Sequence, residues 1–213
     1  MREVEYTFNV ANEDPVHFTV RMDQKTGNNI RPDGAPTPEW TELDFHQCSN
    51  CPLAKQENPH CPVALVISDI IHPFEKWASF QDIEVTVKTR ERTIISKTTA
   101  QKAISSLLGL EIAISGCPLT SFFKPMARFH LPVSSIEETV YRVAGEYLLA
   151  QYFLHKDGKN IDLDFEGLND IYKNMHIMNT SIAERIRAAS QTDSTLNALV
   201  ILDLFSQDRK SVV

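Results

Sequence analysis

Residues 82–110, DIEVTVKTRERTIISKTTAQKAISSLLGL, contain the change from strand to helix that decides the fold. In the first part, Ile83, Val85 and Val87 alternate with polar residues, which is the period of a half-buried β-strand. A short charged turn and a second strand-like run, residues 93–97, follow, so this region predicts a β-hairpin. The apolar residues after position 98 instead follow helical spacing, and they are Ala100, Ala103, Ile104, Leu107 and Leu108.

A second hairpin is predicted at the N-terminal end. Residues 4–10 and 16–22 both alternate apolar and polar positions, and residues 12–15, NEDP, have the composition of a turn. Residues 23–38 are rich in Gly, Pro and Asn and predict a loop. A short extended piece is expected at 40–45, just before the first cysteines.

Helical segments are expected on both sides of the 82–110 region. Residues 63–80 look helical, with Pro62 in the first turn and Pro73 kinking or ending the first part. Ser134 and Glu137 match a capping box, which predicts the start of a long helix. Residues 165–189 predict another long helix. A last helix is expected to hold Leu196, Leu199, Val200, Leu202 and Phe205.

This order of elements predicts an α+β fold. Antiparallel strands in two hairpins pack with helices in the N-terminal part, and a helical bundle forms the C-terminal part. The strand-rich half is expected to span residues 1–97, with the cysteine loop at 46–62 and one helix. The bundle is expected to span 98–213. A sheet can bury its apolar face only against a helix, so the two halves are expected to form one compact unit.

Composition excludes several classes of protein. The chain of 213 residues has a formal charge of −7, which argues against binding to nucleic acid or to an anionic membrane surface. Its seven glycines form no GxG, so dinucleotide-binding and Walker A loops are absent. The N-terminal sequence does not resemble a signal peptide, and no apolar run reaches the length of a membrane span. We therefore expect a cytoplasmic protein.

The four cysteines are the strongest functional signal in the sequence. Cys48, Cys51 and Cys61 follow the pattern C-x2-C-x9-C, and Cys117 follows after 55 intervening residues. Clustered cysteines in a cytoplasmic protein are more often metal ligands or redox groups than disulfides. A C-x2-C turn can bring two thiolates to one centre, a third can reach it through a loop, and a remote fourth can complete a tetrahedron.

Two kinds of centre suit four thiolates, a structural zinc ion and an iron–sulfur cluster. Zinc sites usually pair two C-x2-C knuckles, and this chain has one. A local group of three with one remote ligand is more typical of a [4Fe–4S] cluster. Proline follows Cys51, Cys61 and Cys117, as it often follows the last cysteine of ferredoxin motifs. Cys61 and Cys117 are expected to begin short helical segments, whose free N–H groups favour thiolate.

Several other residues are candidates for the same site. His46 and His60 flank the cysteines, and either could replace one cysteine in a Cys3His site. Lys124, Arg128 and His130 form a basic group that could balance the negative charge of a cluster or hold an anion. The competing interpretation is a solvated basic loop over packed aromatic side chains.

Glu111 and Gln151 stand within apolar helical stripes. A buried carboxylate must be paired or protonated, so Glu111 is expected to pair with Arg128 or another base. Cys48 and Cys51 could also form a dithiol redox pair. The residues after them read as a loop, whereas a thioredoxin-like motif needs a helix there.

Three segments carry a resemblance to a known family. HQCSNCPL (46–53), TTAQKAISSLLGL (98–110) and SGCPLTSFFKPMARFHLP (115–132) resemble a family of uncharacterised bacterial proteins of about this length. The likeness runs over most of the chain, and the four cysteines fall in or beside these segments. The resemblance implies a soluble, cysteine-containing bacterial protein whose activity is not established. It supplies no catalytic residues.

Three functional hypotheses follow from the sequence. The first is a cytoplasmic metal-binding protein in which the four cysteines hold an iron–sulfur cluster or zinc, with a redox or structural role. Arg128 and His130 would then tune the centre. The second is a metal-free module that binds a partner protein or forms a homodimer. The third is an enzyme with a reactive thiol, activated by His46 or His130.

Overall fold

The computed structural model describes residues 1–74 and 77–189 and has an α+β fold. Its four-stranded antiparallel sheet has the order β2-β1-β3-β4. Strand β1 (Arg2–Asn9) pairs with β2 (Val16–Met22), and β3 (Asp82–Lys88) pairs with β4 (Thr93–Thr99). Strand β1 also pairs with β3, so the two hairpins join into one sheet.

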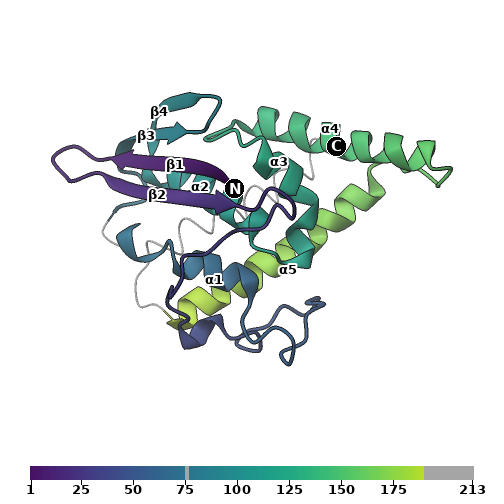
Figure 1. The fold of residues 1–213 in the computed structure, drawn as a ribbon, viewed down its shortest axis with the longest axis horizontal. Helices are drawn as coiled ribbons and strands as arrows, with labels where there is room; N and C mark the ends of the chain where they lie inside the picture. The colour runs from purple at the N-terminus through teal and green to yellow at the C-terminus, as the bar shows by residue number, and fades with distance from the viewer. Residues whose placement is uncertain (75–76, 190–213) are drawn as a thin grey trace.

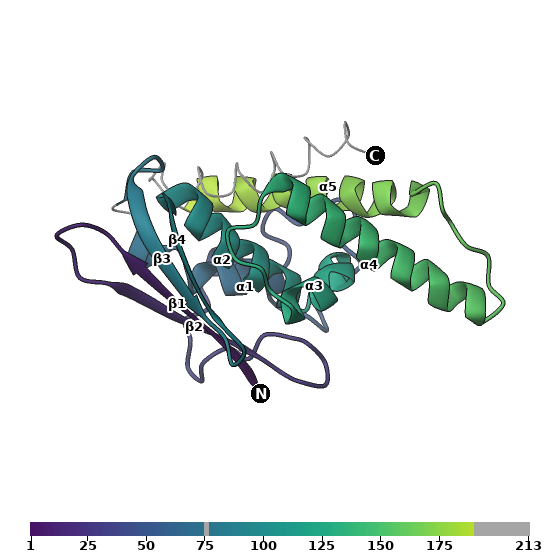
Figure 2. The same ribbon diagram turned by 90° about the horizontal axis from the view of Figure 1, so that it is seen from above.

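One face of the sheet is buried and the other faces solvent. Side chains of β1 and β3 alternate between the two faces, and Tyr6, Phe8 and Val85 are buried on the inner face. On the edge strand β4, Ile95 is exposed. The helices cover the inner face only, as the view from above shows (Figure 2).

Helix α2 (Ala100–Ile114) lies against the inner face of the sheet. It begins directly after β4 and is capped by Thr99, whose hydroxyl accepts from the N–H of Lys102. Eleven of its 15 residues are buried, because the sheet lies on one side and other helices lie on the other. Helix α1 (Pro62–Ser68) packs beside it.

After α2 the chain forms two short helices and two long ones. The 3-10 helix η3 (Pro118–Phe123) leads into α3 (Lys124–Arg128). Helix α4 (Ile136–Lys156) extends away from the sheet, and a loop returns the chain into α5 (Glu166–Ala189) (Figure 1). Helix α5 runs back beneath the short helices to the 3-10 helix η1 (Glu39–Thr41).

The main hydrophobic core draws on both the strand-rich and the helical parts of the chain. It joins side chains of β1, α1 and α2 with Met178, Ile182 and Ile186 of α5. Three of the four cysteines belong to this core, and Cys51 packs against it. A smaller cluster forms around Val143, Tyr147 and Leu168, where α4 meets α5.

Most of the predicted strands and helices are confirmed, with differences at their ends. The capping box of α4 uses Ser135 and Glu138, one residue after the predicted pair, because both of its reciprocal hydrogen bonds form there. The helix predicted over 63–80 ends as α1 at Ser68, and only a 3-10 turn (His72–Phe74) surrounds Pro73. The piece predicted as extended at 40–45 starts as η1. The last predicted helix lies outside the described residues.

No single helix in the described part of the chain is long and apolar enough to cross a membrane. By length and composition alone, α2 and the segment Pro118–Arg128 meet the criterion together, across a bend of 113°.

Candidate functional site

The four cysteines come from three segments that meet at one side of the core. Cys48 and Cys51 lie in the loop before α1, where the N–H of Cys51 donates to the carbonyl of Cys48 at 3.0 Å. Cys61 is the N-cap residue of α1, and Cys117 is the N-cap residue of η3. In each case a proline begins the helix, as the sequence predicts.

The cysteine side chains lie close enough to influence one another electrostatically. Cys48, Cys61 and Cys117 are buried, Cys51 is half-buried, and all four are free thiols. The pKa of Cys117 is raised to about 11, mainly by burial and to a smaller degree by the charges of Cys61, Cys48 and Cys51. Burial likewise raises the pKa of Cys48, to which Cys61 and Cys51 contribute. The remote Cys117 therefore lies near enough to the other three for their charges to affect the pKa of its thiol.

Two sulfur atoms of this group accept hydrogen bonds. The side chain of Ser181 on α5 donates to Cys48, and the backbone N–H of Leu119 donates to Cys117. Both bonds favour the thiolate over the thiol, and the thiolate is the form that binds a metal. Asn50 also ties the cysteine loop to α5, because its amide donates to Asn174 at 2.9 Å.

A buried cation lies beside the cysteines. Arg185 of α5 is 1% exposed, and its positive charge lowers the pKa of Cys48. Its guanidinium donates to the carbonyls of Trp40, Glu42 and Leu43 at 3.0, 2.6 and 2.7 Å. Its Nε has no hydrogen-bond partner, and no carboxylate of the described residues lies within ion-pair distance.

In this conformation the four sulfur atoms do not form a preassembled metal site. Among residues 1–74 and 77–189, no group of three or more His, Cys, Asp or Glu side chains has the geometry of a bound metal ion. Cysteine thiolates are nevertheless the ligands that structural zinc ions and iron–sulfur clusters use.

The flanking histidines have other contacts. Nδ1 of His60 is 2.9 Å from the hydroxyl of the buried Thr41. His46 lies at the surface, where Nδ1 is 3.8 Å from a carboxylate oxygen of Glu184 and the ring packs against Phe45. These contacts leave Nε2 of each ring as the atom that could bind a metal.

The three residues of the predicted basic group, Lys124, Arg128 and His130, do not lie together. Lys124 donates to Asn28 at 2.6 Å, and Arg128 is exposed at the end of α3. His130 bonds to the hydroxyl of Tyr6, which is also 3.1 Å from that of Ser106. Desolvation lowers the pKa of His130 to about 3, with a smaller effect from Arg142, so its ring is neutral at pH 7. His130 therefore supplies no positive charge for a cluster.

The two polar residues in helical stripes are both buried and both hydrogen-bonded. Glu111 accepts from the amide of Asn29 rather than from Arg128, so the expected ion pair with a base is wrong. Because desolvation dominates, the pKa of Glu111 rises to about 8 and the side chain is mostly a neutral acid at pH 7. Gln151 accepts from the N–H of Asp162 at 2.9 Å.

Sequence comparison places the chain in a family. The model of a family described as a domain of unknown function (DUF6901) matches residues 4–213. The chain belongs to this family. The match begins within β1 and covers the rest of the sheet, the cysteine segments and the helices. Comparison with curated proteins and with solved structures gave no match.

Sequence reasoning missed the residues of α5 that face the cysteines. Arg185 lies between Ile182 and Ile186 in the apolar stripe of this helix, and all three are buried. A cation at a core position of an amphipathic helix is the signal that could have identified it. Ser181 gives no comparable signal, since a serine on a helix is ordinary.

Proposed function

We propose that this protein carries a metal centre held by Cys48, Cys51, Cys61 and Cys117. The observation that carries the proposal is the mutual electrostatic influence of the four thiols, which come from three separate segments. A thiol buried beside three others gains little from packing alone, whereas a metal uses all four as thiolates. Cytoplasmic conditions keep such thiols reduced and available.

The surroundings of the cysteines support this proposal through their charge. Four thiolates around Zn²⁺ or around a [4Fe–4S]²⁺ core leave a net charge of about −2. Burying that charge needs a nearby cation, and the buried guanidinium of Arg185 supplies one beside Cys48. Arg185 therefore takes the charge-balancing role that the sequence suggested for Arg128 and His130.

Of the two centres, we favour the iron–sulfur cluster. The local group of three cysteines with one remote member is the reason, as is the single C-x2-C pair. Such a cluster would give the protein an electron-transfer or redox-sensing role. A zinc ion with four thiolates has no open position, and it would tie the cysteine loop to the start of η3 as a structural element.

Anaerobic purification with metal analysis and a visible spectrum tests the proposal. We expect about four iron and four sulfide per chain with a broad absorption near 400 nm, or one zinc and no colour. Cys117→Ser should lose most of the metal. Thr120→Ser, a conservative change at the buried neighbour that donates to the Cys117 carbonyl, should keep it. His46→Ala and His60→Ala should keep it too, and a loss in either would indicate a Cys3His site.

The proposal fails if the wild-type protein, after anaerobic reconstitution with iron and sulfide or with zinc, binds neither. It also fails if Cys117→Ser binds as much metal as the wild type. A fold check by circular dichroism separates loss of a ligand from loss of the fold.

The thiol-enzyme alternative receives little support from the geometry. A nucleophilic cysteine needs a lowered pKa, whereas burial raises the pKa of Cys117 to about 11 and raises that of Cys48. The histidines suggested as its bases contact Glu184 and Tyr6 instead.

A second candidate function, binding to a protein partner, is favoured by the surface of α4. Only Val143, Tyr147 and Gln151 of its 21 residues are buried. Large apolar side chains spaced along the rest of the helix are exposed, and they are Tyr141, Leu148, Leu149, Tyr152 and Phe153. An exposed apolar patch on a helix that extends from the body of the molecule is typical of an interaction site (Figure 1).

Self-association is the simplest form of this second function. Leu148 and Tyr152, like Leu149 and Phe153, are four residues apart and so neighbours on the helix surface. Light scattering after gel filtration should give a dimer for the wild type and a monomer for Leu149→Glu combined with Phe153→Glu. Lys159→Glu, an exposed charge change beyond α4, should leave the dimer intact. A wild-type monomer across the accessible concentration range would end the dimer proposal.

A further inference from the structure

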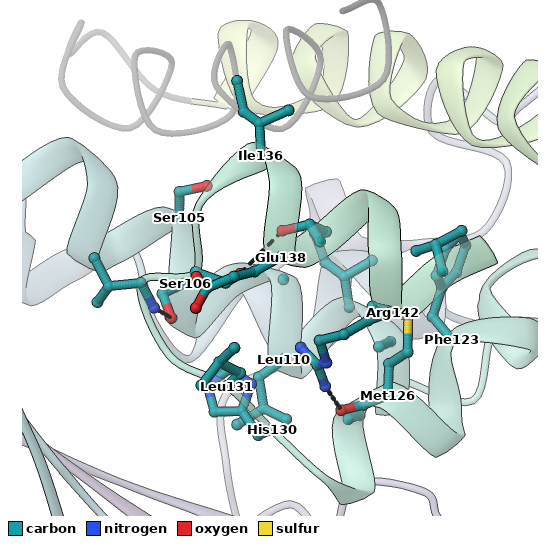
Figure 3. A pocket seen from close by; sticks show the side chains of 18 of the residues that line it. Ser105, Ser106, Leu110, Phe123, Met126, His130, Leu131, Ile136, Glu138 and Arg142 are labelled. Carbon is teal, nitrogen blue, oxygen red and sulfur yellow. Dashed lines mark hydrogen bonds between the residues drawn. The ribbon is translucent and has the colours of Figure 1, made fainter. Parts of the chain in front are cut away.

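A cavity of about 580 Å³ lies apart from the cysteines, between α2, α3, the first turns of α4 and α5 (Figure 3). Its volume falls within the range of pockets that bind small organic molecules, roughly 300–1,000 Å³. Most of its wall is apolar, with contributions from Leu110, Ala113, Phe123, Met126, Val143 and Met175. A ligand that fills it must therefore have a largely apolar body.

Two buried polar side chains on this wall make no hydrogen bond to another described residue. Ser105 of α2 and Asn179 of α5 are each 5% exposed, and both line the cavity. Among the described residues, the fully buried side-chain atoms without a partner belong to Asn29, Asn50 and Arg185, so the polar atoms of Ser105 and Asn179 are open to the cavity. Together they offer a hydroxyl and an amide to a polar group inside the cavity.

A cation lies on the same wall. Arg142 of α4 is partly buried, and its Nη2 donates to the carbonyls of Met126 and Phe129 at 2.9 and 2.8 Å (Figure 3). Desolvation lowers the pKa of Arg142, and the negative charge of Glu138 offsets part of this effect. Among the residues that the structure describes, no carboxylate lies within 4 Å of this guanidinium, so its remaining N–H groups can serve an anion.

The other titratable groups around the cavity leave the positive charge in excess. Lys102 adds a second cation, and Glu138 is the acidic residue of the wall. The carboxylate of Glu138 accepts a hydrogen bond from the N–H of Ser135, so one of its oxygens is occupied by the capping box. His130 is neutral at pH 7, because desolvation lowers its pKa to about 3. The wall therefore carries more positive than negative charge.

We propose that this cavity binds a monocarboxylic acid with an extended apolar body, of the size of a medium-chain fatty acid. The apolar body would occupy the space between α2, α3 and α5. The carboxylate would pair with Arg142, and Ser105 or Asn179 would donate a further hydrogen bond to it. The charge of the head group distinguishes this ligand from a neutral amphiphile of the same length.

Calorimetric titration with sodium dodecanoate below its micelle concentration tests the proposal, with 1-dodecanol as the neutral probe. The wild type should bind dodecanoate at least about tenfold more tightly than dodecanol, which is ~1.4 kcal/mol. Arg142→Gln should remove this preference, and Arg142→Lys should keep part of it. Arg187→Gln, a matched change at an exposed arginine of α5, should leave both affinities unchanged.

A variant whose side chain fills the cavity provides the second test. Ala113 is buried on the wall, so Ala113→Phe should place a ring in the cavity and weaken dodecanoate at least about tenfold. Equal affinity of the wild type for the acid and the alcohol would overturn the proposed ligand class. Failure of Ala113→Phe to weaken dodecanoate, in a variant whose circular dichroism matches the wild type, would overturn the proposed site.

Discussion

The guanidinium of Arg185 donates a hydrogen bond of 2.7 Å to the carbonyl oxygen of Leu43. This bond, with those to Trp40 and Glu42, ties α5 to the segment that leads into the cysteine loop. The same side chain lies close enough to Cys48 to lower the pKa of its thiol. One buried cation thus attaches a long helix, and in the proposed metal centre it would also balance the charge of the thiolates.

Replacing Arg185 should destabilise the protein strongly. Arg185→Met leaves three backbone carbonyls of the segment before the cysteines without their donors, which should lower the free energy of unfolding by about 3 kcal/mol or more. Arg185→Lys should recover part of that loss, since an ammonium keeps the charge but reaches fewer carbonyls. Urea denaturation measures both. Arg187→Met on the exposed side of the same helix is the control and should change stability by less than about 0.5 kcal/mol.

The buried acid Glu111 should make stability fall as pH rises. Its pKa is about 8 in the folded protein, against an ordinary value of 4.5, so the folded state binds more protons between these values. Stability is therefore lost through this window, with a slope of up to about 1 kcal/mol per pH unit. Glu111→Gln should remove that slope in urea denaturation between pH 5 and 8. An unchanged slope would show that Glu111 is ionised in the fold, and the exposed Glu57→Gln serves as the control.

A methyl group at Gly167 should clash with Tyr147. A Cβ built on Gly167 meets the hydroxyl of Tyr147, which donates to Asp162 at 2.6 Å. Although alanine is favoured over glycine in a helix by about 1 kcal/mol, Gly167→Ala should destabilise the protein by about 1–3 kcal/mol. Tyr147→Phe in the same chain removes the obstructing oxygen and should make the glycine substitution less costly. Additive effects of the two changes in thermal unfolding would rule out the clash.

If the cysteines hold a metal, its removal should loosen specific segments. Chelation should speed hydrogen exchange at the backbone N–H groups of Cys51, Cys61 and Thr120, which bond near the sulfurs. The N–H groups shared by β1 and β3 should keep their protection, because the sheet depends on strand pairing and not on the cysteines. Equal acceleration in both regions would indicate global unfolding, and no change in either would argue against a resident metal.

The strands and most helices could be predicted from local pattern. Alternation along β3 and the three-and-four spacing of α2 reflect burial on one side, and burial is a property that each segment carries in its own sequence. Helix ends were harder to place, since hydrogen bonds decide them. Ser134 and Ser135 are both capable caps, and only the geometry of the chain selects Ser135.

For the candidate site, too, part could be predicted from the sequence and part could not. Cysteine spacing in the sequence predicts a centre formed by three neighbouring cysteines and the remote Cys117, because a metal needs several sulfurs. The histidine at position 130 was expected near them, but its contacts are with Tyr6 and the cavity wall. Proximity along the chain does not predict which side of a helical turn a residue faces.

By itself, the sequence determined the fold class, since each segment carries its own hydrophobic period, while the metal centre of the four cysteines stays a prediction. The tertiary structure alone decided which charges become neighbours. The charge of Arg185 lowers the pKa of Cys48, and Glu111 accepts a hydrogen bond from Asn29, although each pair comes from segments far apart in the chain. Such pairs depend on how α2 and α5 pack against the rest of the protein, and no local pattern encodes that packing.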